Sequence, residues 1–201
     1  MIRLIGLVLL AVAVLGLTAP ARANVIEYNA VLTGPNESPP TPSTATGIAI
    51  VDYDNVAHTL RVRATFSGLT SNTTAAHIHA ATTTPLTGIA GVATPVPAFP
   101  NFPLGVLSGT YDGTLNLTQQ SSYNPPYFTA NGSTPATAEA ALTSALAAGT
   151  AYFNIHTTNF PGGEIRGFLV PVPEPSSLAL LGTAAVGALA AARRRAARAR
   201  A

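Results

Sequence analysis

Three of the four histidines in this 201-residue chain stand in two short segments whose composition suits a metal site. His77 and His79 flank Ile78, and His156 lies far downstream in a second alternating segment. Side chains two residues apart on a strand point to the same face, so His77 and His79 are expected to project together, away from Ile78. Neutral imidazole is a ligand for zinc, copper and nickel.

The apolar neighbours of these histidines indicate which side of each strand faces the core. Phe153 and Ile155 share one face of the later segment, and Asn154 and His156 share the other. With the apolar side chains in the core, the histidines are predicted to lie on the outer surface. If the two strands are neighbours, three imidazoles converge there, and Glu164 is a candidate carboxylate ligand.

A structural role is the alternative interpretation of the same residues. The imidazoles are then expected to hydrogen-bond to the backbone and to the side chains of Asn154 or Thr157, fixing the turn that follows. Glu164 and Arg166 are predicted to form an ion pair with each other or with a neighbouring strand. The sequence leaves the metal site (copper or zinc) and the structural role open, and direct catalysis is not expected.

Strand-like runs separated by turn residues must position these side chains. In 59–66, Leu60 and Phe66 fall on one face and Arg61 and Arg63 on the other. Such a series predicts an all-β sandwich or barrel. The expected strands are 25–32, 47–54, 59–66, 75–80, 109–117, 151–156 and 164–170.

The segments between the strands predict one helix and one long loop. A helix is expected after Thr134 and Pro135, ending at Gly149. The proline-rich segment 82–105 is predicted to be a surface loop that exposes Phe99 and Phe102 for contact with carbohydrate or protein. Asp52 and Asp54, at a strand end, favour a solvated turn over a calcium site, since further carboxylates are missing.

The charge distribution excludes a nucleic-acid-binding domain. The chain has a net charge of +2, but seven of its ten basic residues, all arginine, lie near the two ends. Residues 24–170 hold three arginines and seven acidic residues, a net charge of −4. Binding to nucleic acid needs basic residues clustered on the folded domain. The absence of cysteine excludes disulfide scaffolds and thiolate metal sites.

The N-terminus has the pattern of a secretory signal peptide. Arg3 precedes an apolar run over 4–17, and the small residues Ala21 and Ala23 supply the motif that signal peptidase accepts. The run is shorter than the roughly 20 residues needed to span a bilayer. Residues 1–23 are therefore predicted to be removed on export.

The C-terminus combines three features in a fixed order. Pro173, Glu174 and Pro175 come first, residues 176–192 follow without charge, and five arginines lie in the last nine positions. The apolar span predicts a transmembrane helix whose C-terminus stays in the cytoplasm. The ending resembles the PEP-CTERM sorting signal of Gram-negative bacteria. This resemblance implies a transient inner-membrane anchor, an exosortase-type protease as partner, and release to the cell surface or the extracellular polymer.

Two internal segments resemble the CHRD domain, a module named from chordin. They are Ala76-His77-Ile78-His79-Ala80 and the stretch 149–167, which contains Tyr152-Phe153-Asn154-Ile155-His156-Thr157 and Pro161-Gly162-Gly163-Glu164-Ile165-Arg166-Gly167. The resemblance implies a β-sandwich of immunoglobulin-like or Cu,Zn superoxide dismutase-like character, without an established catalytic activity. Four histidines and no cysteine are too few for the dismutase's two metals and its disulfide, so dismutase activity is not expected.

These observations predict three regions: a signal peptide over 1–23, a CHRD-type domain over 24–171 and a sorting signal over 172–201. The expected function is that of a non-enzymatic component of the cell surface or extracellular matrix, with extracellular polysaccharide or surface proteins as partners. The alternative is a copper- or zinc-binding or redox protein that uses His77, His79 and His156.

Overall fold

The strands of this protein carry apolar side chains at alternate positions. The computed structural model describes residues 25–173. Leu60, Val62, Ala64 and Phe66 are buried, as their spacing predicts. The strands are β1 (Val25–Thr33), β2 (Thr46–Asp54), β3 (Thr59–Ser67), β4 (Thr73–His79), β5 (Gly109–Asn116), β6 (Tyr152–Thr157), β7 (Ile165–Phe168) and the short β8 (Val170–Pro171).

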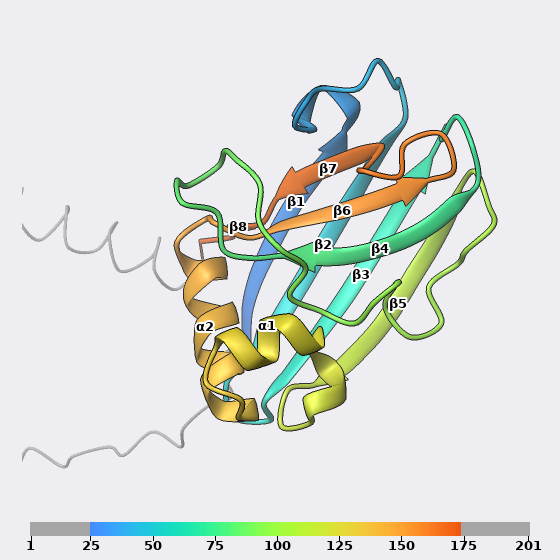
Figure 1. Cartoon of the computed structure of the whole chain (residues 1–201). Coiled ribbons are helices and arrows are strands. Elements are labelled where there is room, and N and C mark those ends of the chain that lie inside the picture. The colour runs from blue at the N-terminus through green and yellow to red at the C-terminus, as the bar shows by residue number, and fades with distance from the viewer. Residues whose placement is uncertain (1–24, 174–201) are drawn as a thin grey trace, which may run out of the picture.

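The strands form one continuous antiparallel sheet in the order β4-β6-β7-β1-β2-β3-β5, with β8 paired to β1. The sheet curls, so that β4, β6 and β7 lie across β1, β2 and β3 (Figure 1). One hydrophobic core fills the space between the two halves. Ile78, Phe153 and Ile155 enter it from one half, and Leu32 and Val62 enter it from the other.

The segment between β4 and β5 closes the open side of the curled sheet, and the prediction that Phe99 and Phe102 are exposed is wrong. Phe99 stacks between Phe153 of β6 and Tyr111 of β5, at centroid distances of 5.6 and 5.7 Å. Phe102 stacks on Phe66 at 5.6 Å. Both rings are buried because they fill the gap that the sheet leaves between its two edge strands.

The same segment covers the edge of β4. The amide of Phe99 donates to the carbonyl of Ala76, and the amide of Ala93 donates to the carbonyl of Ile78. An exposed strand edge is a site for unwanted pairing with other chains, and these bonds satisfy it within the molecule.

Two α-helices lie at one end of the sheet: α1 (Pro125–Ala130) and α2 (Pro135–Ala147) (Figure 1). The hydroxyl of Thr134 accepts a hydrogen bond from the amide of Thr137, and Gly149 has a φ of +66°, so the predicted start and end of α2 are confirmed. The sequence did not predict α1, nor the short 3-10 helices η1 (Gly34–Asn36) and η2 (Gln120–Ser122).

The expected all-β class is confirmed in its coarse form, as a curled antiparallel sheet with few helices. The finer likeness to immunoglobulin or dismutase sandwiches stays a prediction. No helix within residues 25–173 is long and apolar enough to cross a membrane. The predicted signal peptide, with Ala21 and Ala23, and the predicted membrane span, with Glu174 and Pro175, lie outside the described residues.

Candidate metal centre

Pairing between β4 and β6 brings the three predicted histidines together. His77 lies opposite Asn154, and His79 lies opposite Tyr152. His156 is two residues beyond Asn154, on the same face. The centroid of the His77 ring is 4.7 Å from that of His79 and 4.6 Å from that of His156. The convergence predicted from strand alternation is therefore present.

The three imidazoles are buried, which contradicts their expected place on the outer surface. His77, His79 and His156 are only 5%, 8% and 8% exposed. They point away from the core, as alternation requires, but loops cover them. We call the outward side of β4, β6 and β7 the covered face. Strand periodicity predicted the side of the sheet correctly and could not predict the loops above it.

Each imidazole is held by one backbone carbonyl from these loops. The Nδ1 atoms of His77 and His79 contact the carbonyl oxygens of Pro97 and Ala90, at 3.1 and 2.8 Å. The Nδ1 atom of His156 contacts the carbonyl oxygen of its own turn, at Pro161, at 2.9 Å. A carbonyl oxygen only accepts, so each Nδ1 carries the proton and donates it.

The opposite ring nitrogens are left with lone pairs. Nε2 of a neutral imidazole protonated at Nδ1 is an acceptor. The Nε2 atoms of His77, His79 and His156 are buried and have no hydrogen-bond partner within residues 25–173. The predicted structural role is thus satisfied at Nδ1, through the backbone rather than through Asn154 or Thr157, and leaves Nε2 unused.

Burial keeps the three rings neutral. It is the main cause that lowers the pKa of His77 to about 3 and that of His79 to about 4, from an ordinary value of 6.5. The neighbouring imidazoles lower both further. Burial also lowers the pKa of His156. A metal ion binds to neutral imidazole, so the ligands need not lose a proton at neutral pH.

The separation of the ligand atoms suits one ion. One ring nitrogen of each histidine lies within 4.8 Å of the other two. An ion bonded to imidazole nitrogens at about 2.0–2.1 Å holds them about 3.3–3.6 Å apart, so small rotations of the rings would complete the site. The outer contacts are those of a metal site as well, because ligating histidines commonly donate their other N–H to a carbonyl.

Glu164 is not part of this cluster, contrary to its predicted role as a fourth ligand. The carboxylate is fully buried and accepts hydrogen bonds from the hydroxyls of Ser43 and Thr157 and from the amide of Thr70, at 2.6–2.7 Å. These donors come from three separate segments, so Glu164 ties the ends of several strands together. These hydrogen bonds hold the carboxylate, which lies outside the three-histidine cluster.

Arg166 does not pair with Glu164 either, although an ion pair with a neighbouring segment is found. The guanidinium Nε lies 3.7 Å from a carboxylate oxygen of Glu37, and both side chains are buried. Arg166 also donates to the carbonyls of Asn36 and Gly88. Arg166 therefore fastens two loops onto the covered face.

Tyr152, Arg166 and Glu37 extend the cluster from His79, each in contact with the next, and were not predicted as part of the site. The ring of Tyr152 stacks on His79 with centroids 4.6 Å apart and planes 7° apart, and the Arg166 guanidinium carbon lies 4.6 Å from the Tyr152 centroid. Strand alternation could have identified Tyr152, which shares the face of His156. Glu37 carries no such signal, because it lies in a distant loop.

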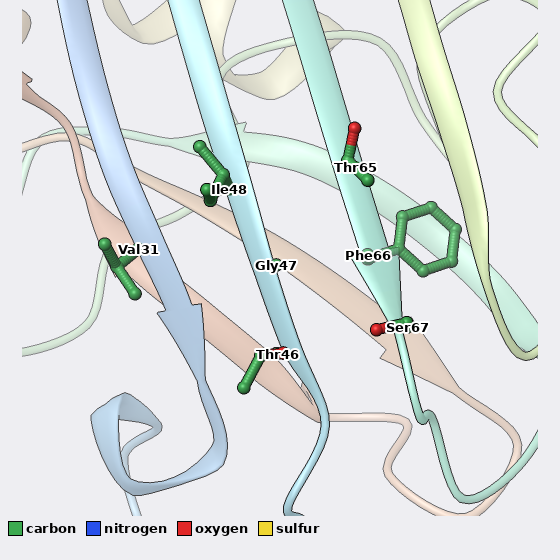
Figure 2. A pocket seen from close by; sticks show the side chains of 7 residues that line it. All are labelled: Val31, Thr46, Gly47, Ile48, Thr65, Phe66 and Ser67. Atoms are coloured by element: carbon green, nitrogen blue, oxygen red, sulfur yellow. The ribbon is translucent and has the colours of Figure 1, made fainter.

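The outward side of β1, β2, β3 and β5, which we call the open face, differs in exposure. Arg61 pairs with Asp112, and Arg63 pairs with Asp52, while Asp54 accepts from backbone amides in the turn after β2. The predicted exposed turn follows Asp54, whereas Asp52 lies within β2 and pairs with Arg63 instead. Figure 2 shows a shallow hollow at one end of this face, with side chains from neighbouring strands around it. It is lined by Val31, Thr46, Gly47, Ile48, Thr65, Phe66 and Ser67.

Comparison with protein families identifies both parts of the chain. A model of the CHRD domain matches residues 28–169, and a model of the PEP-CTERM protein-sorting motif matches residues 171–195. No curated protein and no solved structure matches the chain. The sorting motif supports export, anchoring in the membrane before processing, and processing by an exosortase-type system. The chain therefore belongs to the CHRD domain family and carries a PEP-CTERM sorting motif behind that domain.

Proposed function

We propose that this exported CHRD protein binds one transition-metal ion through Nε2 of His77, His79 and His156, and acts as a non-enzymatic component of the cell surface or extracellular matrix. One observation carries the metal proposal. The three buried Nε2 atoms have no hydrogen-bond partner within residues 25–173, and one ring nitrogen of each histidine lies within 4.8 Å of the other two.

The energetic argument is that an unpaired buried acceptor is destabilising. Leaving a buried polar atom without a partner costs about 1–3 kcal/mol. Three such atoms in one cluster are costly for a purely structural role, which needs only the Nδ1 bonds. Coordination of a cation by all three Nε2 atoms offsets this cost at once.

The enclosure of the site favours binding over catalysis. A catalytic metal keeps one coordination position open to water or substrate. Here loops cover the three rings, whose exposed fractions are 5–8%. The fourth histidine, His58, contacts Glu139 of α2 instead, so the two-metal arrangement of a dismutase is not supported.

Calorimetry with the mature protein from producing cells tests this proposal. Titration with zinc, copper and nickel ions is expected to give one binding event per chain. The double variant His77→Ala/His79→Ala is expected to lose it, while His58→Gln, which removes the histidine outside the cluster, keeps it. Equal heats from the wild type and the double variant would contradict the proposal.

A second candidate function is attachment to extracellular polysaccharide or surface proteins through the open face. Val31 and Ile48 favour it, since 65% and 54% of their surfaces are exposed on adjacent strands. Retention of the protein by purified exopolysaccharide is the test. The variant Val31→Thr/Ile48→Thr is expected to elute earlier than the wild type, and unchanged elution would exclude this surface.

Processing of the tail has its own measurement. We expect the mature protein to end near Pro173, Glu174 and Pro175, where an exosortase-type system would act. Mass spectrometry of the C-terminal peptide determines the end. A mature chain that still carries Arg200 and Ala201 would show that the tail is kept and the domain remains anchored.

A further inference from the structure

The ligand set at the candidate metal centre is electrically neutral. Three imidazoles, each donating its Nδ1 proton to a backbone carbonyl, supply an Nε2 lone pair but no negative charge. Glu164, the buried carboxylate adjoining this face, is held by Ser43, Thr70 and Thr157. No ligand would thus neutralise the charge of an ion bound among these buried rings.

A positive charge lies beside the cluster. The guanidinium carbon of Arg166 is 4.6 Å from the centroid of the Tyr152 ring, which stacks on His79. The positive charge of Arg166 is thus one aromatic ring away from His79. Glu37, the ion-pair partner of Arg166, offsets this positive charge only in part. Burial raises the Glu37 pKa to about 7, so its carboxyl is partly protonated near neutral pH.

Charge then discriminates between ions that imidazole alone does not separate. Imidazole suits both zinc and copper. The desolvation cost of an ion grows with the square of its charge, so a divalent ion loses about four times as much as a monovalent ion of equal size. Repulsion from Arg166 is also twice as large for the divalent ion.

The number of ligands acts in the same direction. Zinc in proteins is almost always four-coordinate, and divalent copper prefers a square or tetragonal arrangement. Within residues 25–173 the cluster offers three ligand atoms in a triangle. Monovalent copper accepts a lower coordination number and has no comparable need for a fourth ligand.

We propose that the three-histidine site selects monovalent copper over divalent zinc and copper, and that the positive charge of Arg166 is a specificity determinant. This inference rests on the metal-binding function proposed above. Arg166 would act through space on the bound ion, not as a ligand.

Competition titrations under anaerobic conditions test this selectivity. The mature protein competes with bicinchoninate for Cu(I) and, separately, with a chelating dye for Zn(II). Wild-type protein is expected to bind Cu(I) more tightly. The variant Arg166→Gln is expected to lower the ratio of Cu(I) to Zn(II) affinity by about tenfold or more, because one buried charge is removed.

Two further variants separate charge from structure. Arg166→Lys keeps the charge and is expected to keep the ratio, whereas Glu37→Gln removes the partial negative charge and is expected to raise it. A ratio that is the same for Arg166→Gln and Arg166→Lys would overturn the role of Arg166. Tighter binding of Zn(II) by the wild type would overturn the selectivity while leaving the metal site intact, and binding of neither ion would overturn both proposals.

Discussion

The open face and the covered face are built by the same strand alternation and have opposite chemistry. On the open face Arg61 and Asp112 form an ion pair with each side chain about half exposed to solvent. On the covered face His77, His79 and His156 are buried and keep an unpaired nitrogen each. Polar residues on the open face are exposed to solvent and pair with one another. Those on the covered face contact loops.

This difference shows that two separate features determine the environment of an outward side chain. Alternation decides on which side of the sheet it lies. The loops between the strands decide whether that side is exposed to solvent. The segment between β4 and β5 supplies the carbonyls of Ala90 and Pro97 to the covered face, and no comparable segment is seen over Val31 and Ile48 within the described residues.

The largest expected effect on stability comes from removing the Phe99 ring, which belongs to the segment between β4 and β5. The ring is buried between Phe153 and Tyr111, so Phe99→Ala is expected to lower the free energy of unfolding by about 3–5 kcal/mol. Urea denaturation measures it. The matched change on the open face, Ile48→Thr, is expected to stay within about 0.5 kcal/mol. Equal losses for the two variants would show that the segment is not part of the core.

Saturation of the candidate metal centre has the next largest effect. An ion that binds only the folded state at 100 times its Kd adds about 2.7 kcal/mol of stability. We expect the melting temperature of the wild type to rise on addition of the preferred ion, with no rise for His77→Gln/His79→Gln. A rise of the same size in both proteins would place the ion elsewhere.

Removal of the Glu164 charge tests the hydrogen bonds by which this carboxylate holds three segments together beside the covered face. Glu164→Gln replaces one acceptor oxygen by a donor that faces hydroxyl and amide donors, and it is expected to cost about 1.5–3 kcal/mol. The partly exposed carboxylate Glu27 provides the control, as Glu27→Gln. Thermal unfolding at neutral pH compares the two. A loss no greater than that of the control would contradict the hydrogen-bonding role.

Acidification is expected to destabilise the metal-free protein through the histidines. Their folded pKa values, about 3 for His77 and about 4 for His79, lie below the ordinary 6.5, so the unfolded chain binds more protons in between. Their contribution is complete above about pH 6.5 and is lost as the pH falls toward 4 for His79 and toward 3 for His77. Glu37 acts oppositely, since its folded pKa of about 7 exceeds 4.5 and removes stability as the pH rises between these values.

Melting temperature against pH separates these two contributions. Glu37 is present in both the wild type and His77→Gln/His79→Gln, so the difference between the two curves reports the histidines. The variant is expected to lose less stability on acidification. Parallel curves would contradict the neutral, buried state of the imidazoles.

The smallest effect is expected on the open face. Arg61 and Asp112 pair at the surface with each side chain about half exposed, where side-chain entropy and screening offset the attraction. Arg61→Ala is expected to leave the melting temperature unchanged within experimental error, at low and high salt. A clear loss at low salt would mean that the two faces differ less than the comparison suggests.

The sequence was sufficient for the features that depend on local periodicity. Alternation placed Leu60 and Phe66 in the core and His77 and His79 together on the other side of the sheet, and capping residues marked α2. These features follow from neighbours in the chain and from the geometry of single elements.

Features that depend on distant segments were not predictable in this way. The proline-rich composition around Phe99 and Phe102 indicated an exposed loop. Both rings are instead buried, because they fill the gap between β4 and β5. Glu37 meets Arg166 across 129 positions of the sequence. Only the folded sheet brings such residues together, so burial of the histidines and the diversion of Glu164 could not be read from spacing.

Nitrogen NMR of the histidine side chains tests the central claim most directly. In the metal-free protein, His77, His79 and His156 are predicted to be neutral, with the proton on Nδ1 and a bare Nε2. One equivalent of the bound ion is predicted to shift all three Nε2 resonances and to leave His58 unchanged. Protonated Nε2 atoms in the metal-free protein, or Nε2 resonances that do not respond to any of the ions, would contradict the account.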